Sequence, residues 1–312
     1  MKSRGPAGLN AARGAAFTRV LIYSESVEGI VALNGIPRRG ASRRIGAGLV
    51  GMLGLLLASW PAAAQTSAGD AAPDPVEVMR RVQRQDTAPD EQVQFTMRLV
   101  DSSGRVRERT GTVYEKQVSA GAVDEMRLIR FHAPPDIQGS GILTVENPDR
   151  ENDQWLYLPA YHTTRRVASA NRGDRYMGTD FLYEDIMRER IREYAYRVDG
   201  TEAVDGIPCL IIEATPTDER LARESAYSKK RVWIDTARDL ILKVDYFNRD
   251  GRLLKHLTVT QTEKVGNWHR WRAVRMQDLD RQHETTVEYR DRKIGAGVPK
   301  NYFTEAYLKR GQ

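Results

Sequence analysis

Glu91-Gln-Val-Gln-Phe-Thr-Met-Arg-Leu99 is the stretch of sequence that decides the fold, because apolar and polar residues alternate along it. In an extended chain the apolar side chains fall on one side and the polar ones on the other. One buried face and one solvent-exposed face are typical of a strand in an antiparallel sheet. The turn residues at 101–104 and the polar run at 105–118 then predict a hairpin.

Short runs of the same kind recur through the rest of the chain. We expect about ten or eleven strands, one helix near 75–85 and a final segment, 301–308, that is helix or strand. Segment 199–208 is predicted to be a loop. Because strands follow strands with few helices between them, βαβ folds are excluded. The sequence therefore predicts a mainly β protein whose large sheet curls, splits or closes.

The N-terminal region carries the features of a secretory signal. Four arginines at 38–44 precede an uncharged run, 45–60, and Ala62-Ala63-Ala64 follows as a cleavage site. We expect residues 1–37 to be a non-structural upstream extension, 38–64 a signal peptide cleaved near Ala64, 65–75 a flexible lead-in, and 76–312 one domain. The apolar run is short for a membrane span, although a retained anchor is the alternative. The prediction is an exported, periplasmic protein.

Removing the signal changes the charge of the protein. Residues 1–64 hold 8 of the 48 basic and 2 of the 42 acidic residues, which leaves 40 of each in the remainder. A formally neutral chain lacks the basic surface that nucleic-acid binding requires. No nucleic-acid partner is expected.

The single cysteine, Cys209, excludes an internal disulfide. It lies far from the cleavage site, so the mature protein is not expected to carry a lipidated N-terminal cysteine. Within the apolar run 207–212 it is expected to be a small buried hydrophobe; a reactive thiol is the alternative.

A second stretch, Arg172-Gly-Asp-Arg-Tyr-Met-Gly-Thr-Asp-Phe-Leu-Tyr-Glu-Asp-Ile186, breaks the alternating pattern. It predicts a glycine-punctuated loop that runs into a short helix lying over the sheet as a lid. Thr179 or Asp180 would cap that helix, and Glu184 and Asp185 would lie near the positive end of its dipole. Salt bridges from these acids are expected to Arg165, Arg166, Arg172 or Arg175.

The run Leu158–Asp174 (LPAYHTTRRVASANRGD) and the run Tyr176–Ile186 (YMGTDFLYEDI) together resemble the LolA-like outer-membrane lipoprotein-sorting proteins, in the branch found beside RND-type (MMPL) exporters. The resemblance covers about 75–312, although His162-Thr163-Thr164 departs from the basic run of the family. It implies a curved antiparallel half-barrel with helices over its mouth and an apolar cavity for acyl chains. It also implies an RND/MMPL-type transporter as a partner and transient contact with a membrane surface.

Aromatic and other apolar residues are the candidates for lining such a cavity. An ordinary packed core is the alternative explanation for each of them. Together they could line a ligand cavity, because a curved sheet with few helices does not fill itself. Binding would come from apolar burial, about 0.8 kcal/mol per buried CH₂. The candidates are Phe95, Met97, Leu99, Trp155, Tyr157, Met177, Phe181, Tyr183 and Trp233.

Catalysis is the competing functional class. His162 with Asp180, Glu184 and Asp185 offers acid–base groups, but no metal-binding spacing accompanies them. Nucleophile-elbow and phosphate-loop motifs are also missing from the sequence. No enzyme activity, metal or cofactor is expected. The sequence therefore predicts a carrier of a lipid or an acylated lipoprotein. The alternatives are an envelope docking module with a packed interior and, with less support, a hydrolase.

Overall fold

The structure is a computed structural model that describes residues 72–310. The predicted upstream extension, signal peptide and most of the lead-in lie outside the described residues. The first element is the helix α1, Pro75–Asp86, where the Asp74 side chain accepts a hydrogen bond from the backbone N–H of Val76. The buried residues of α1 are Val78, Met79 and Val82, so the predicted N-terminal helix is confirmed.

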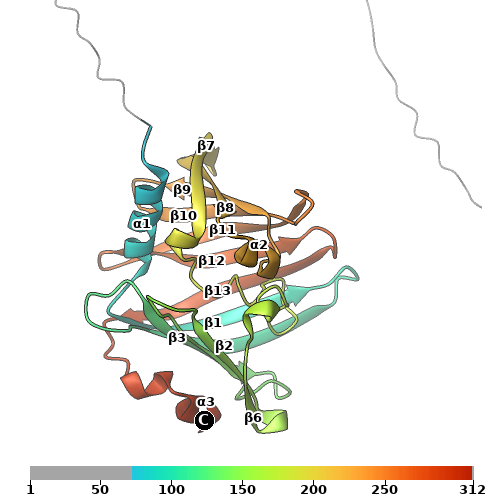
Figure 1. The fold of residues 1–312 in the computed structure, drawn as a ribbon. Helices are drawn as coiled ribbons and strands as arrows, with labels where there is room; N and C mark the ends of the chain where they lie inside the picture. Colours follow the sequence, from blue (N-terminus) through green and yellow to red (C-terminus); the bar gives the residue numbers. More distant parts are fainter. Residues whose placement is uncertain (1–71, 311–312) are drawn as a thin grey trace, which may run out of the picture. The chain divides into compact units, whose positions relative to one another are not determined.

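One antiparallel sheet of thirteen strands forms the body of the domain (Figure 1). It is curved and does not close into a barrel, which confirms the predicted half-barrel. The strands are β1 (Asp90–Val100), β2 (Val106–Gln117), β3 (Glu125–Ala133), β4 (Gly141–Val145), β5 (Asp153–Leu158), β6 (Thr163–Arg166), β7 (Tyr194–Val204), β8 (Ile207–Pro216), β9 (Lys229–Asp235), β10 (Leu240–Phe247), β11 (Leu253–Val265), β12 (Trp268–Asp278) and β13 (His283–Ile294).

The strand order is β6-β5-β4-β3-β2-β1-β13-β12-β11-β10-β9-β8-β7, so strands that are neighbours in the sheet are neighbours in sequence except at one place. There the first strand pairs with the last, β1 with β13. The predicted count of ten or eleven strands was too low. The predicted loop at 199–208 was also wrong, because β7 continues to Val204 and turns directly into β8 through Asp205 and Gly206, both at positive φ.

Buried apolar side chains form two clusters on the sheet. The face that we call the cavity face carries Val93, Val113 and Ile129, which belong to the larger cluster. Side chains alternate along a strand, so Leu128 and Leu143 point to the opposite face, where they form a second cluster with the C-terminal segment. That segment is a 3₁₀ turn, η4 (Lys300–Phe303), followed by the helix α3 (Glu305–Arg310).

The segment 172–193, which we call the strap, contains no α-helix, so the predicted lid helix was wrong. It is built of turns, a single β-bridge between Arg175 and Leu182, and a 3₁₀ turn, η3 (Ile191–Glu193). Leu182 lies in the predicted helix but pairs with Arg175, and the backbone N–H of Tyr183 donates to the carbonyl of Asp174 at 3.0 Å, so the chain folds back on itself here instead of starting a helix. The side chains of Thr179 and Asp180, expected to cap the helix, make other contacts.

Three further elements complete the chain: the 3₁₀ turns η1 (Pro159–Tyr161) and η2 (Ser169–Asn171) and the short helix α2 (Glu219–Glu224). Within residues 72–310, every helix is too short or too polar to cross a membrane.

Candidate ligand-binding cavity

A cavity of about 330 Å³ lies between the cavity face of the sheet, the helix α1 and the strap. Most of its wall is apolar, and the strap contributes Phe181, Ile186, Met187 and Ile191 to it. The volume falls at the lower end of the range of about 300–1,000 Å³ that small-molecule pockets span. The other apolar and aromatic lining residues are Met79, Val82, Val93, Val113, Ile129, Tyr196, Leu240, Ile241, Tyr246, Leu257, Trp271, Val274 and Tyr289.

A second hollow of about 200 Å³ lies next to the first and shares several wall residues with it, among them Met79, Met187 and Trp271. The part of its wall that is not shared is more polar and includes Lys230, Arg190 and Glu193. The two hollows therefore meet beneath the strap, with the apolar volume concentrated in the larger one.

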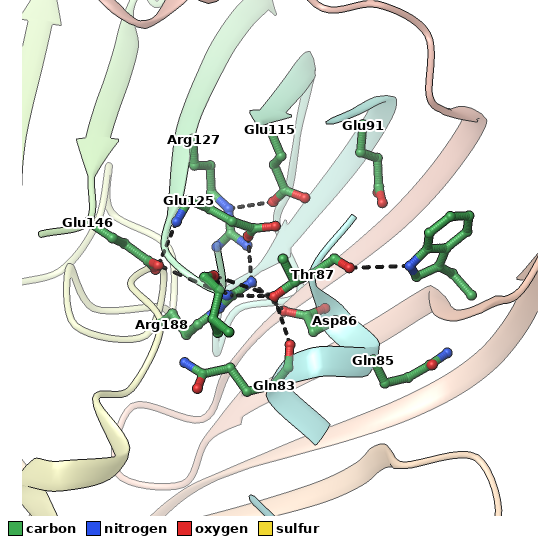
Figure 2. Close-up of polar contacts among 12 residues, drawn as sticks. Gln83, Gln85, Asp86, Thr87, Glu91, Glu115, Glu125, Arg127, Glu146 and Arg188 are labelled. Carbon is green, nitrogen blue, oxygen red and sulfur yellow. Dashed lines mark hydrogen bonds and ion pairs between the residues drawn. The ribbon is translucent and has the colours of Figure 1, made fainter. Parts of the chain in front are cut away.

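One end of the larger cavity is polar (Figure 2). Arg127 of β3 bonds Glu115 of β2 at 2.5 Å and also donates to the carbonyl of Ile186 in the strap at 3.2 Å. Arg188 of the strap pairs with the buried Glu125, lies 3.4 Å from Asp86 and 4.0 Å from Glu146, and donates to Thr87 Oγ1 at 2.9 Å. We call Asp86, Glu115, Glu125, Glu146, Arg127 and Arg188 the acidic end of the cavity.

The neighbouring part of the same rim is built around Glu91. Its carboxylate accepts from Arg270 at 2.9 Å and also pairs with Arg292, which bonds Glu263 at 2.7 Å. Arg270 further donates to the carbonyls of Gln85 and Asp86, the last residues of α1. This arginine therefore binds the free carbonyls at the C-terminal end of the helix.

Burial raises the pKa of three carboxyls at this end of the cavity. The pKa of Glu125 lies well above its usual range because burial disfavours the charged form, and Arg188 offsets this only in part. Burial likewise raises the pKa of Glu146 and of Glu91. Glu115 raises the pKa of both Glu125 and Glu91 further through like-charge repulsion.

Buried polar contacts hold the strap over the cavity. The carboxylate of Asp180, fully buried, accepts from His283 Nδ1 at 2.6 Å, Thr285 Oγ1 at 2.6 Å and Arg281 at 3.3 Å. Lys255, also buried, donates to the Asp180 carbonyl at 2.9 Å and to Asp185 at 2.5 Å. The strap is therefore fixed to β11 and β13 by charged groups that water does not reach.

The second half of the strap is fixed in the same way. Asp185 also accepts from the Tyr227 hydroxyl at 2.7 Å, and Glu184 accepts from Ser225 Oγ at 2.8 Å and the Ala226 N–H at 2.9 Å. Burial raises the pKa of Glu184. The predicted salt bridges from these acids to Arg165, Arg166, Arg172 or Arg175 are wrong, since Arg166 pairs with Asp153 and Arg175 with Asp278.

The residues that were predicted to line the cavity lie in different parts of the structure. Phe181 lines the cavity. Phe95, Met97 and Leu99 are buried in the larger cluster, with Met177 and Tyr183 at its margin, but none of these lines the cavity. Trp155 and Tyr157 belong to the cluster on the opposite face, so their assignment to the cavity was wrong.

Trp233 was also misplaced. Its neighbour Val232 lines the second hollow, so alternation turns Trp233 to the other face of β9. There its indole N–H donates to Glu202 at 2.6 Å, and the Lys243 ammonium lies 3.9 Å from the ring centroid.

The residues that do line the cavity were missed for a simple reason. Val113, Ile129 and Val274 are ordinary apolar positions of alternating strands, and only the register of the sheet places them together. The polar residues Arg127 and Arg188 carried no local signal either. The alternation of β3 gave the one available hint, because Arg127 and Ile129 share a face.

The groups of the catalytic alternative do not meet. Asp180, Glu184 and Asp185 are each bound by the buried partners described above, while His162 is exposed after η1. Among residues 72–310, no group of three or more His, Cys, Asp or Glu side chains is arranged to hold a metal ion. Cys209 is buried, and burial raises the pKa of its thiol, which disfavours the reactive thiolate.

Comparison with known structures defines the class of fold. A DUF1329 family protein from Desulfovibrio piger is 28% identical with a TM-score of 0.70, and the match covers 76% of this chain and 100% of that one. An outer membrane lipoprotein-sorting protein domain from Vibrio parahaemolyticus is 27% identical with a TM-score of 0.70, covering 76% and 98%. A LolA superfamily protein from Nitrosomonas europaea shares the fold at 19% identity and a TM-score of 0.60, covering 76% and 100%. The fold is that of the LolA-like proteins, as the sequence motifs predicted.

A family model described as an uncharacterized protein matches residues 123–310, more than half of the chain. The chain belongs to this family of uncharacterized proteins, DUF1329. No curated protein matches it. The association with RND exporters stays a prediction.

Proposed function

We propose that this protein is a periplasmic carrier that binds the acyl chain of a lipid or lipoprotein in the cavity beneath the strap. The observation that carries the proposal is the cavity of about 330 Å³, walled by apolar side chains of the sheet, α1 and the strap. The Vibrio neighbour, with its lipoprotein-sorting name, supports the same class of cargo and delivery toward the outer membrane. The RND-type transporter is part of the proposal as the partner in that delivery.

The size of the cavity limits the cargo. An apolar cavity of about 150 Å³ holds one benzene-sized ligand, and this one is roughly twice as large. That volume suits a single chain rather than several. Each buried methylene contributes about 0.8 kcal/mol to binding, so a few methylenes give useful affinity without making release impossible.

The test is native mass spectrometry of residues 66–312 purified from a bacterial envelope, with lipid extraction of the same sample. We expect a stoichiometric lipid or acyl adduct. A clean apo mass that stays clean after addition of phospholipid or lipopeptide would contradict the proposal and favour the docking module.

A matched pair of variants locates the binding site. Ile186 of the strap is half-buried and lines the cavity, whereas Val118, the residue after β2, is half-buried against the opposite cluster. Ile186→Asp should reduce the adduct at least severalfold, because a carboxylate then faces the acyl chain. Val118→Asp should keep it. Equal retention by both variants would show that the lipid binds elsewhere.

A further inference from the structure

Arg172, the first residue of the strap, is a cation without a partner. It lines the second hollow and is half-buried. Its Nε is buried and has no hydrogen-bond partner within residues 72–310, and no carboxylate in that range forms an ion pair with its guanidinium. A cation that has lost part of its hydration without gaining an acceptor is stabilised when an anion binds to it.

The other cations in the wall of this hollow already have acidic partners. The ion pairs of its charged lining residues are Lys230–Glu189, Arg190–Glu193, Arg220–Glu151, Arg188–Glu125 and Lys255–Asp185. Glu184 accepts from Ser225 and from the Ala226 N–H, and burial raises its pKa, which favours its neutral form. An incoming anion can therefore bind Arg172 without breaking an existing ion pair.

A second hydrogen-bond donor lines the same hollow. Tyr194 is the first residue of β7, and its hydroxyl makes no hydrogen bond within residues 72–310. Burial raises the pKa of Tyr194 to about 12, so the hydroxyl stays protonated and can donate at neutral pH. The charges that act on this pKa include that of Arg172, which places the two groups close together.

The hollow continues into the larger, apolar cavity. The two share Met79, Met187, Ile241, Tyr246 and Trp271 in their walls. An apolar chain that lies in the larger cavity can therefore place its end group in the second hollow.

We propose that the second hollow binds the anionic head group of an amphiphile, a carboxylate or a phosphate, at Arg172 and Tyr194, while the chain lies in the larger cavity. This inference rests on the proposed function, because the chain occupies that cavity. A guanidinium offers parallel N–H donors to an anion of this shape, and the Tyr194 hydroxyl adds a further donor. A cationic head group would be repelled by Arg172.

The experiment measures binding of decanoate, decanol and decylamine to the protein by isothermal titration calorimetry at neutral pH and low salt. The three probes have chains of the same length and differ in the head group. We expect decanoate to bind about tenfold more tightly than decanol, because it gains charge-assisted hydrogen bonds, and decylamine to bind most weakly. Added salt should reduce the advantage of decanoate, because Arg172 is partly exposed.

Substitutions test the two residues. Arg172→Gln removes the charge and should abolish the advantage of decanoate while leaving decanol binding unchanged. Arg98→Gln is the matched control and should keep the full advantage: Arg98 also forms no ion pair within residues 72–310, but it is exposed on β1 and lines neither hollow. Tyr194→Phe should reduce the advantage severalfold.

Decyl phosphate and inorganic phosphate identify the source of the anion. If Arg172→Gln weakens decyl phosphate more than decanoate, the head group is a phosphate, and the reverse assigns a carboxylate. Inorganic phosphate should bind much more weakly than decyl phosphate, because it has no chain to bury. Equal binding of these two would mean that the hollow takes a free ion, which contradicts the proposal.

The possible outcomes separate this inference from the carrier proposal. If decanol and decanoate bind and decanoate has no advantage, the head-group inference is wrong and the carrier proposal stands. An advantage that survives in Arg172→Gln also contradicts the inference, because the anion then binds elsewhere. If none of the probes binds, the carrier proposal fails and this inference fails with it.

Discussion

At the scale of single residues, Asp180 joins the strap to the N-terminal end of β13. It is fully buried and accepts from His283, Thr285 and Arg281 at once. Asp180→Ala would leave these donors without their acceptor, which typically costs about 3–5 kcal/mol for a buried charged partner. We expect a loss of that order in urea unfolding.

The control for Asp180 is a carboxylate that forms an ion pair but is exposed to solvent. Glu219 pairs with Arg223 and its side chain is 94% exposed, so Glu219→Ala should change the free energy of unfolding by less than about 0.5 kcal/mol. Asp180→Asn, which keeps one acceptor oxygen, should fall between the two. A loss for Asp180→Ala no larger than for Glu219→Ala would mean that the strap is not held by this residue.

Glu125 gives the protein a predictable dependence on pH. Its pKa is raised well above 4.5 by burial in the folded state, so the folded protein binds this proton more tightly than the unfolded chain does. The stabilisation is complete below about pH 4.5 and is lost as pH rises through the folded-state pKa. Between about pH 5 and about pH 8 the Tm of the wild type should therefore fall more steeply than that of Glu125→Gln.

A control variant separates the effect of Glu125 from that of the other carboxyls that titrate. Glu288→Gln, at an exposed position paired with Arg290, should keep the wild-type slope. If the Glu125→Gln protein shows that same slope too, Glu125 does not titrate differently in the folded and unfolded states.

Sequence reasoning found several important residues but not their roles. The stretch 172–186 was recognised as exceptional, and Asp180 and Asp185 within it make the buried contacts described above. Their partners His283 and Lys255 lie on strands about 70 to 100 positions away. No local pattern predicts such a pairing, so capping was the natural but wrong interpretation.

At the scale of elements, α1 forms one side of the cavity wall although it buries few apolar side chains. It buries three apolar residues, Asp74 caps its N-terminal end, and Arg270 of β12 binds the carbonyls at its C-terminal end. Asp74→Ala removes the side-chain acceptor for the N–H of Val76 and should reduce stability by about 1 kcal/mol. Chemical denaturation measures this change.

Serine at position 74 provides the conservative control for that cap. Asp74→Ser keeps an acceptor oxygen in place and should restore most of the lost stability. Equal losses in the alanine and serine variants would mean that charge near the helix end, rather than the hydrogen bond, is what matters.

Elements with a strong local pattern were predicted well, and those shaped by distant contacts were not. The alternation of β1, the turn before Gly251 and the amphipathic α1 are all visible in the sequence and present in the structure. The second part of the stretch 172–186 was predicted to be a short helix because Thr179 or Asp180 could cap it and Glu184 and Asp185 would lie near the positive end of its dipole. The bridge from Arg175 to Leu182 and the hydrogen bond from the Tyr183 N–H to the Asp174 carbonyl form a turn in its place.

At the scale of the whole molecule, the sequence predicted the architecture but not which side of the sheet each residue faces. A mainly β, curved and open sheet followed from strand patterning and from the family motifs, and it is confirmed. Trp155 and Tyr157 were assigned to the wrong face, because the second apolar cluster beneath α3 was not foreseen. A sheet with apolar residues on both faces gives no sign in one strand of which face carries the cavity.

The pairing of β1 with β13 has a consequence for how the protein is made. Glu91 lies opposite Ile294, 203 positions later in the chain. β1 is synthesised first and cannot complete the sheet until its partner β13 has been synthesised. Contacts of such long range make folding slow. Until then β1 and β12 each expose an unpaired edge of the kind that recruits other strands. A newly made chain thus depends on protection from aggregation until its final strand is available.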